Sequence, residues 1–520
     1  MRILAISLGL VLAAAAALPG QDALPVAYVN DSTGDHLWRC EDLDCDGDYD
    51  DAGECVRYFD SAIGGLLLDN NVSVVTDASG AVFASSLNSD VIVKLVDLNG
   101  DGDANDAGES MIAFDGTPGG NLSAIQLFTA NGLWIDDQGI LWVAHADAGA
   151  GGVDAIYRLE DLNADGDFND AAEGKLWYAP PTAGSIGDSI PGAVRKGNDG
   201  AIYYLEVGST GLYAKGIYRL DDANGDGSID PLTEVAPFFL PSVPVGGSNI
   251  FFWGFTQAAD DTFFMADTLN ERVLRFRDDD GSLLVDEATE SNVWWTAAGS
   301  SNIWNVVVDA FGNVYCPEDQ TPDRILVLQD ENGDGMVDAS ETDTVYDDTV
   351  ATDDIAKPRG ITIVPLPPRY AGNGTDLETR VSVNGRASEA TSNVHCVQAA
   401  DILTFEFVSP GGTRNGEGFA AVAQLQVSGS PPAPLQLDPL DAAPSVYLDL
   451  SQALTIVFDG LNPSPGALFA PVVGPWQYTA ALPAGLSGLG FSIMVEIFVH
   501  DAALNGVGIG NAPSTEIRIL

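Results

Sequence analysis

The stretch Asp97-Leu-Asn-Gly-Asp-Gly-Asp-Ala-Asn-Asp-Ala-Gly-Glu109 recurs along this chain and decides its architecture. Copies occupy residues 42–54, 161–173, 222–234 and 330–341, and a degenerate copy occupies residues 278–290. Their first aspartates stand at 42, 97, 161, 222, 278 and 330, so the period is 52 to 64 residues. A repeat of this kind is typical of solenoids, propellers and arrays, in which neighbouring units bury one another's apolar faces.

The repeated loop has the composition of a calcium-binding loop. In the last copy Asp330, Asn332 and Asp334 stand at positions 1, 3 and 5, Gly335 at position 6 and Glu341 at position 12, which is the EF-hand loop pattern. Ca²⁺ takes about six to eight oxygen ligands, commonly with a carboxylate near position 12. The first four copies place their glutamate at position 13, so their closing geometry must differ slightly.

One isolated copy would suit a solvated turn equally well. Five good copies at the same place in a repeat favour calcium, because crowded carboxylates repel one another unless a cation neutralises them. We therefore predict about five structural calcium ions. The predicted ligand positions are Asp42, Asp44, Asp46, Asp48, Asp51, Glu54, Asp97, Asn99, Asp101, Asp103, Asp106, Glu109, Asp161, Asn163, Asp165, Asp167, Asp170, Glu173, Asp222, Asn224, Asp226, Ser228, Asp230, Glu234, Asp330, Asn332, Asp334, Met336, Asp338 and Glu341. The degenerate copy has Ser282 and Leu283 at positions 5 and 6, and we expect it to hold no ion or to hold it weakly.

Each repeat also contains four short stretches of alternating apolar and polar residues bounded by Asp, Asn and Gly turns. In the third repeat these stretches are residues 132–136, 140–145, 155–159 and 175–178. Such evenly spaced strand signals predict a closed all-β fold, and six units predict a six-bladed β-propeller. The first repeat lacks its inner strand, which Gly360-Ile-Thr-Ile-Val364 supplies from the far end. We therefore expect N- and C-terminal strands to close the ring in blade 1.

The chain divides into three predicted regions. Residues 1–20 combine Arg2, an apolar run and the alanine-rich Ala13–17 segment, as in a secretory signal peptide. Residues 21–366 form the propeller, and Pro365-Leu-Pro-Pro368 marks a stiff joint after it. Residues 367–520 have several short strands and no helical periodicity, which predicts a C-terminal β-sandwich.

Three stretches resemble NHL-type propeller repeats: Gly132-Leu-Trp-Ile-Asp-Asp-Gln-Gly-Ile-Leu-Trp-Val-Ala144, Val306-Val-Val-Asp-Ala-Phe-Gly-Asn-Val-Tyr315 and Asn270-Glu-Arg-Val-Leu-Arg-Phe276. The resemblance covers roughly residues 24–364 and implies the propeller fold. Some six-bladed propellers are enzymes, among them lactonases, an amidating lyase and quinone-dependent dehydrogenases. Those resemblances imply polar or metal-binding side chains along the central channel.

The predicted entrance to that channel offers few functional groups. Inner strands are expected to enter it at Val72, Gly132, Gly192, Gly254, Asn305 and Gly360, of which only Asn305 has a polar side chain. His36 and His145 are too few for a three-histidine zinc site, and we predict a structural role for both. No catalytic residue is assigned.

Charge and the N-terminal segment restrict the partners. A net charge of −55 excludes nucleic acid, whose phosphates would be repelled. No apolar stretch after the signal segment is long enough to span a membrane. We expect a secreted or cell-surface monomer with a protein or glycan ligand.

The five cysteines cannot all pair within one chain. Cys45 and Cys55 flank the first loop and are the favoured disulfide, with Cys40–Cys55 as the competing pair. Cys316 and Cys396 are predicted to be buried thiols.

The predicted function is a non-catalytic binding, adhesion or scaffold module in which calcium is structural. Phe238, Phe239, Phe251, Phe252 and Trp253 lie in a long connection opposite the calcium loops and form a candidate ligand face. They would equally serve as a plug between blades four and five, which we favour. The alternative function is a lactonase- or lyase-like hydrolase with a separate metal in the channel near Asn305.

Overall fold

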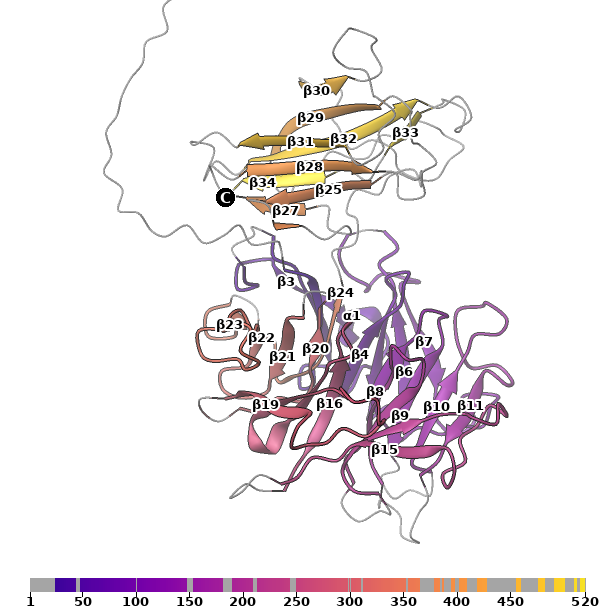
Figure 1. Cartoon of the computed structure of the whole chain (residues 1–520). Helices are drawn as coiled ribbons and strands as arrows, with labels where there is room; N and C mark the ends of the chain where they lie inside the picture. Colours follow the sequence, from indigo (N-terminus) through magenta and orange to yellow (C-terminus); the bar gives the residue numbers. More distant parts are fainter. Residues whose placement is uncertain are drawn as a thin grey trace, which may run out of the picture. The chain divides into compact units, whose positions relative to one another are not determined.

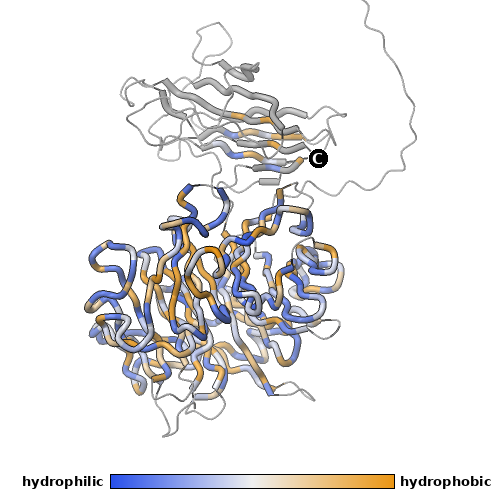
Figure 2. Tube along the Cα trace, turned by 180° about the vertical axis from the view of Figure 1, so that it is seen from behind, coloured by the Kyte–Doolittle hydropathy of each residue, from blue (hydrophilic) through white to orange (hydrophobic). Residues whose placement is uncertain are grey.

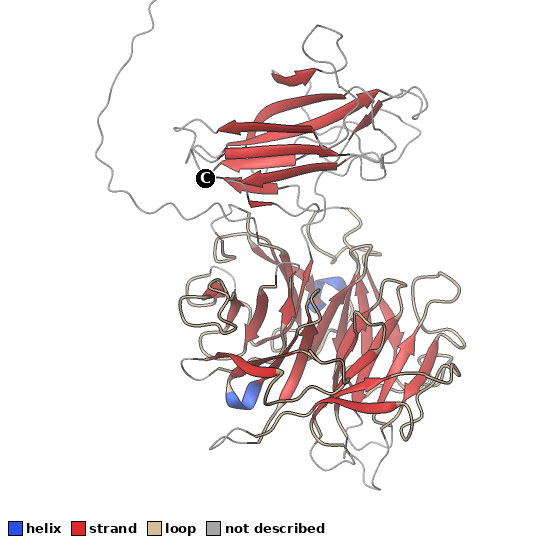
Figure 3. Cartoon of the chain, viewed as in Figure 1, coloured by secondary structure: helices blue, strands red, loops and turns tan. Residues whose placement is uncertain are grey.

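The computed structural model describes residues 24–364 except for 44–46, 100, 147–152, 181–188, 209–212, 244–248, 298, 300, 310–311 and 352–353, together with the strands that follow residue 377. One compact unit comprises Pro25–Asp42 and Asp48–Pro365, and a second contains Leu366–Leu520. Both are built almost entirely of strands (Figure 3). The predicted signal peptide, residues 1–20, lies outside the described residues.

The first unit consists of six four-stranded sheets, which are the blades of a propeller (Figure 1). From the inner to the outer strand they are as follows: blade 1, β24 (Pro358–Val364), β1 (Val26–Asp31), β2 (His36–Cys40) and β3 (Cys55–Asp60); blade 2, β4 (Asn71–Thr76), β5 (Val82–Ser86), β6 (Val91–Leu95) and β7 (Ser110–Asp115); blade 3, β8 (Thr129–Ile135), β9 (Leu141–Ala146), β10 (Ala155–Leu159) and β11 (Gly174–Tyr178); blade 4, β12 (Pro191–Lys196), β13 (Ile202–Glu206), β14 (Gly216–Leu220) and β15 (Val235–Phe239); blade 5, β16 (Phe252–Gln257), β17 (Phe263–Asp267), β18 (Arg272–Phe276) and β19 (Ser291–Thr296); blade 6, β20 (Val307–Val308), β21 (Val314–Glu318), β22 (Arg324–Leu328) and β23 (Thr342–Asp347). Short helices α1 (Ser61–Gly64) and η1 (Thr268–Asn270) lie in the connections.

Blade 1 closes the ring as predicted. Its inner strand β24 comes from the end of the propeller sequence and pairs antiparallel with β1, from Val26 opposite Val364 to Asp31 opposite Pro358. The side chain of Asn30 adds to this seam, because its Oδ1 accepts hydrogen bonds from the backbone N–H groups of Arg359 and Gly360. Closing the ring with paired strands removes the free sheet edge that an open propeller would expose.

The apolar core lies between neighbouring blades. One cluster joins Phe83 and Phe114 of blade 2 to Leu133 and Tyr157 of blade 3, and others join the blades that follow. Figure 2 shows the same division along the chain, with hydrophobic residues in the strands and hydrophilic residues in the loops. Because both faces of a blade are covered, middle strands such as β5 and β17 are buried at every residue.

Each acidic loop joins the third and fourth strands of its blade and is tied to the blade before it. The eighth residue of every loop donates a backbone hydrogen bond of 2.7–2.8 Å to the outer strand of the preceding blade, and its side chain is buried. We call these six residues the loop ring: Tyr49, Ala104, Phe168, Ile229, Val285 and Val337. Their acceptors are the carbonyls of Val345, Tyr58, Ala113, Trp177, Phe238 and Trp294. The loops therefore join adjacent blades all the way around the propeller.

The disulfide joins Cys40 and Cys55, the pair that competed with the favoured prediction. Cys40 and Cys55 are joined, with an S–S distance of 2.04 Å and a Cα–Cα distance of 4.1 Å. The favoured Cys45–Cys55 pairing is wrong, because Cys40 and Cys55 stand directly opposite each other in the β2–β3 register. Cys45 lies outside the described residues. Cys316 is a buried free thiol, as predicted, and burial raises its pKa.

The second unit contains two sheets. One has the order β26 (Arg386–Ala387), β25 (Glu378–Val383), β28 (Ile402–Val408) and β31 (Trp476–Ala481). The other has the order β27 (Val394–Val397), β34 (Thr515–Ile519), β32 (Phe491–His500), β29 (Phe419–Val427) and β30 (Thr455–Asp459), with β33 (Ile509–Asn511) paired to β32. A small core includes Val381 and Phe405 from one sheet and Val495 and Ile517 from the other. Within the part of the chain that the structure describes, no helix has the length and apolar character needed to cross a bilayer.

Candidate functional site

The acidic loops share a turn that directs their oxygens inward. In the third loop the first aspartate, Asp161, accepts a hydrogen bond of 2.9 Å at Oδ2 from the backbone N–H of Gly166 at position 6. The same bond of 2.8–2.9 Å joins Asp97 to Gly102, Asp222 to Gly227 and Asp330 to Gly335. Gly166 has φ +98°, a left-handed conformation that glycine adopts without steric cost.

The closing glutamates hold the loop backbone in place. Glu109 is buried, and its Oε1 accepts from the N–H groups of Leu98 and Asn99 while Oε2 accepts from Asp106. Glu173 and Glu341 make corresponding bonds. Each glutamate therefore joins the first and second halves of its loop. This holds for the glutamates at loop position 13 and for Glu341 at loop position 12.

The donor set fits a hard cation. Asp330 Oδ1 is buried without a hydrogen-bond partner among the described residues, as expected of an oxygen that would face a metal. In the third loop the Asn163 amide nitrogen donates to Asp165 at 3.0 Å and to Asp170 at 2.5 Å, which keeps these groups together. Of the predicted ligands, Asp44 and Asp46 lie outside the described residues.

The degenerate fifth loop brings three carboxylates together. Oxygens of Asp278, Asp280 and Glu290 lie within 4.8 Å of one another, a possible metal site. This was the loop expected to hold an ion weakly or not at all. Its third position is Asp280, a carboxylate, where the second, third, fourth and sixth loops have asparagine. Its sixth position is Leu283, which takes the left-handed φ of +63° that glycine takes in the other loops.

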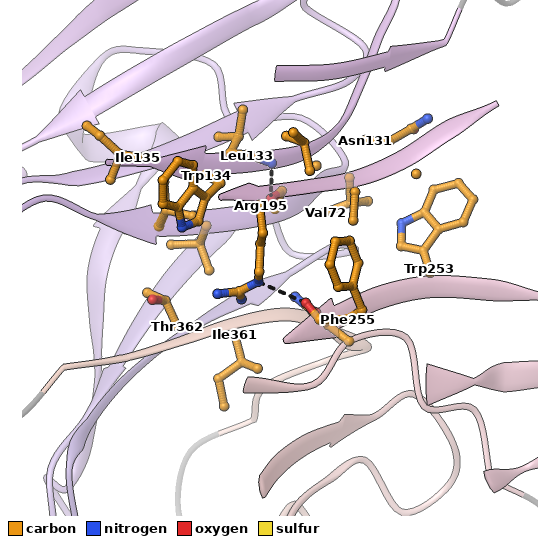
Figure 4. Close-up of a pocket in the computed structure, with 18 of the residues that line it drawn as sticks. Val72, Asn131, Leu133, Trp134, Ile135, Arg195, Trp253, Phe255, Ile361 and Thr362 are labelled. Carbon is orange, nitrogen blue, oxygen red and sulfur yellow. Dashed lines mark hydrogen bonds between the residues drawn. The ribbon is translucent and has the colours of Figure 1, made fainter. Parts of the chain in front are cut away.

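The central channel is a cavity of about 240 Å³ lined by the inner strands (Figure 4). Its polar side chains include Ser73, Asn131, Asn305 and Thr362, and its apolar walls include Leu133, Phe255 and Ile361. Arg195 is the charged residue among the described side chains that line it. No Asp, Glu, His or Cys belongs to this described lining, so the residues present do not fit the channel metal of the alternative prediction.

A ring of irregular residues marks the start of the inner strands. In most blades the strand pairing shifts here, so that one or two inner-strand residues bulge out of register with the second strand. We call these residues the entrance ring: Val72, Asn131, Gly192, Trp253, Trp304 and Arg359. They lie at the end of the blades opposite the acidic loops, because the inner and third strands run in the same direction.

Aromatic and cationic groups meet in one half of the entrance ring. The Trp253 and Trp304 rings lie 5.5 Å apart at 81°, and Phe251 stacks on Trp253 at 5.6 Å. The Arg359 guanidinium lies 4.4 Å from the Trp304 ring centroid, while its Nε donates to Asp319 Oδ2 at 2.8 Å. The Nε1 atoms of both tryptophans are buried and have no hydrogen-bond partner among the described residues.

Four of the predicted entrance residues, Val72, Gly132, Gly192 and Asn305, line the cavity, but the sequence did not predict the other members of the entrance ring. It predicted Gly132, Gly254 and Gly360 at the entrance, whereas the bulges bring the residue before each of them, Asn131, Trp253 and Arg359, into the entrance ring. The glycines serve packing between blades. A Cβ on Gly132 would lie 2.7 Å from Ala193 Cα, and one on Gly360 would lie 2.6 Å from the Val72 carbonyl oxygen.

Other candidate residues have structural surroundings. Asn305, the predicted channel residue, lines the cavity, and its Oδ1 accepts from the backbone N–H of Val306 at 2.8 Å. His145 is fully buried, and its Nε2 accepts from the N–H of Phe128 at 2.9 Å while Nδ1 lies 3.0 Å from the Val153 carbonyl. His36 Nδ1 lies 3.7 Å from Asp60.

The aromatic connection divides into two parts. Phe238, Phe239 and Phe252 are buried in the core between blades four and five, where Phe239 stacks on Phe276 at 4.1 Å. As members of a ligand face they were wrongly predicted, and they form the expected plug because sheet packing covers them. Phe251 and Trp253 remain partly buried beside the channel.

Comparison with known proteins adds distant structural matches. No family model matches the chain, and no curated protein does. A periplasmic gluconolactonase of Pseudomonas aeruginosa matches 66% of this chain and 99% of its own at 11% identity with a TM-score of 0.41. A virginiamycin B lyase of Staphylococcus aureus matches 66% and 92% at 13% identity, TM-score 0.35, and a calcium-binding protein of Agrobacterium tumefaciens, regucalcin, matches 51% and 72% at 15% identity, TM-score 0.30. Similarity this distant identifies no residue or substrate for the present chain.

These matches correct the predicted function. The main prediction was a non-catalytic binding, adhesion or scaffold module, whereas two of the matches are named as enzymes, a lactonase and a lyase. The alternative, a lactonase- or lyase-like propeller, remains a proposal. The channel metal that accompanied that alternative has no ligand set in the described lining.

Proposed function

We propose that the propeller is a small-molecule hydrolase that opens lactone rings at the entrance to its central channel. The observation that carries the proposal is the pair of buried indole N–H groups of Trp253 and Trp304, which lack partners among the described residues. A buried donor without an acceptor costs stability, and such groups are typically kept for a ligand. Trp253, whose ring lies 5.5 Å from that of Trp304, lines a cavity of about 240 Å³, which suits a small ring rather than an oligosaccharide.

The reaction requires an oxyanion stabiliser and a base. The two indole N–H groups would donate to the lactone carbonyl oxygen and strengthen as charge develops on it. Asp319, held 2.8 Å from Arg359, is the carboxylate joined to the entrance ring, and we assign it as the base. Water adds to the carbonyl carbon, the ring C–O bond breaks, and the proton that Asp319 takes from water passes to the leaving oxygen. The product is a hydroxy acid.

A kinetic comparison tests this assignment. The mature chain is assayed against γ-butyrolactone and related small lactones by acid release. Trp304→Phe keeps the ring and removes the N–H, so kcat should fall about 100-fold, the usual effect of one oxyanion donor. Asp319→Asn should lower kcat by at least the same factor. Trp177→Phe alters a buried outer-strand tryptophan away from the channel and should leave kcat unchanged. Turnover that is absent in the wild type, or equal in all variants, contradicts the proposal.

For the acidic loops we propose bound Ca²⁺ with a structural role. The carboxylate and amide oxygens, the inward turn at position 6 and the buried Asp330 Oδ1 support it. Five ions correspond to the loops predicted from sequence, and the Asp278–Asp280–Glu290 group supports a sixth. The N-terminal signal pattern and the net charge of −55 support a secreted or surface-exposed location and a partner that is not nucleic acid.

A further inference from the structure

Arg195 is an unpaired cation inside the channel. Its Nε donates to the Phe255 carbonyl of the next blade at 2.8 Å, and no carboxylate pairs with it among the described residues (Figure 4). Eight other arginines of the propeller are ion-paired with carboxylates, namely Arg39, Arg57, Arg158, Arg219, Arg272, Arg277, Arg324 and Arg359. Arg275, on the third strand of blade 5, is the other described propeller arginine without an ion pair, and it does not line the cavity.

The charge persists at neutral pH. Burial lowers the pKa of Arg195 to about 10, which leaves the guanidinium protonated at pH 7. Arg195 is half-buried against the channel wall, and a partly desolvated charge without a partner favours an opposite charge that joins it. The side chain crosses the cavity beside Thr362 and Trp134, with Phe255 and Ile361 nearby (Figure 4). The channel therefore has a positive site that lacks its counter-charge.

We propose that this site binds a carboxylate on the substrate, so that the substrate of the channel is a small lactone acid rather than a neutral lactone. A monoanionic carboxylate matches the fork of one guanidinium and neutralises it. A phosphate dianion would leave an excess negative charge in a cavity that has no second cation in its described lining. The inference rests on the proposed function, since it names the substrate class of the same site.

The spacing of the two sites sets the orientation of the substrate. Arg195 stands three residues along β12 from Gly192 of the entrance ring, about 10 Å along the strand. The guanidinium Nε is held at the Phe255 carbonyl, two residues along β16 from Trp253 of the entrance ring. The lactone carbonyl would then lie at the indole N–H groups while the carboxylate lies deeper, on Arg195.

A substrate pair and two variants test the proposal. The substrates are γ-butyrolactone and 5-oxotetrahydrofuran-2-carboxylate, which is the same ring with a carboxylate. In the wild type the carboxylate should lower KM at least about tenfold, and in Arg195→Met the two lactones should have the same KM. Lys196→Met changes the adjacent cation, 3.9 Å from Asp137, and should alter neither. Equal KM for both lactones in the wild type, or an Arg195→Met variant that keeps the preference, overturns the proposal.

A binding measurement separates this inference from catalysis. Tetrahydrofuran-2-carboxylate has no carbonyl to attack, and tetrahydrofurfuryl alcohol is its neutral counterpart. Calorimetry should show the acid binding at least about tenfold more tightly than the alcohol, in the wild type and in Asp319→Asn, and not in Arg195→Met. If Asp319→Asn keeps full turnover while this pattern holds, the assigned base fails and the carboxylate site stands. If inorganic phosphate binds Arg195 more tightly than the acid, or Arg195→Met binds the acid unchanged, the carboxylate site fails.

Discussion

The loop ring and the entrance ring are each built from one position per blade, yet they differ in regularity. In the loop ring all six backbone N–H groups donate to the preceding blade at 2.7–2.8 Å, and all six side chains are buried. In the entrance ring the residues vary in size from Gly192 to Trp304, the strand pairing shifts, and two indole N–H groups lack partners among the described residues. The loop ring is regular and its backbone N–H groups are hydrogen-bonded. The entrance ring is irregular and contains the buried N–H groups for which the described residues offer no acceptor.

This difference separates stability from function. A repeated and fully bonded contact between blades is what holds a ring of sheets together. Unpaired donors and an uncompensated cation cost stability, and they persist where a ligand completes them. Substitutions in the loop ring and removal of calcium are therefore expected to change the stability of the fold. Substitutions in the entrance ring are expected to change ligand binding and turnover.

The largest expected effect is removal of calcium. At a free concentration 100 times its Kd, each ion stabilises the fold by about 2.7 kcal/mol, and several loops act together. Excess EGTA should therefore lower the melting temperature of the mature chain strongly, and metal counting before chelation should find five or six ions. An unchanged melting curve in a protein without bound calcium would show that the loop ring is stable on its own.

A pair of aromatic truncations compares the two rings directly. Phe168 is 3% exposed and packs against Phe83 of the preceding blade at 6.1 Å, so Phe168→Ala should cost about 3–5 kcal/mol. Trp253→Ala, at the partly buried entrance, should cost less stability and abolish lactone turnover. Denaturant unfolding and activity are measured for both variants. A larger loss of stability in Trp253→Ala would invert the comparison.

A smaller effect concerns pH at the channel end. Burial, with Asp319 and Asp348 nearby, raises the pKa of Asp323 to about 6. The folded state therefore binds this proton more tightly than the unfolded state, and its contribution to stability is lost as the pH rises from about 4 to about 6. Asp323→Asn keeps an acceptor for the Lys357 N–H and should stabilise the protein at pH 8 by about 1 kcal/mol, allowing for partial solvent screening. At pH 4 the variant and the wild type should unfold alike, and a difference there would refute the assignment.

The smallest effect concerns the fifth loop. Leu283 holds a left-handed φ of +63° where the other loops have glycine. A left-handed conformation costs a side-chain-bearing residue roughly 1–2 kcal/mol, and glycine's greater unfolded-state entropy offsets part of the gain. Leu283→Gly should therefore stabilise the protein by about 0.5–1 kcal/mol in thermal unfolding. Leu284→Gly, the next residue along the same loop, provides the control and should not stabilise.

Much of the fold was accessible to sequence reasoning. The spacing of the aspartates gave the number of blades, and the displaced strand at residues 360–364 gave the closure that β24 and β1 make. The sequence did not decide the disulfide. Proximity to the first loop favoured Cys45 as the partner of Cys55, whereas the partner is set by the residue opposite Cys55 in the β2–β3 pairing, which is Cys40. Four of the six predicted channel residues, Val72, Gly132, Gly192 and Asn305, do line the cavity. Trp253, which precedes the predicted Gly254, was missed, because a bulge has no reliable pattern in a single sequence.

The sequence by itself determined the repeated unit, the oxygen-rich loops and the closed all-β ring, since each depends on local spacing that is written many times in the chain. Only the tertiary structure decided that Trp253, Trp304 and Arg359 meet at one mouth and that Arg195 lies in the cavity with no carboxylate partner in the described part of the chain. These four residues belong to four different blades and are spread over residues 195–359 of the sequence. None of them is part of the repeated sequence pattern. A contact between residues of different blades produces no repeated pattern in the sequence. Such contacts can therefore be identified only from how the blades pack.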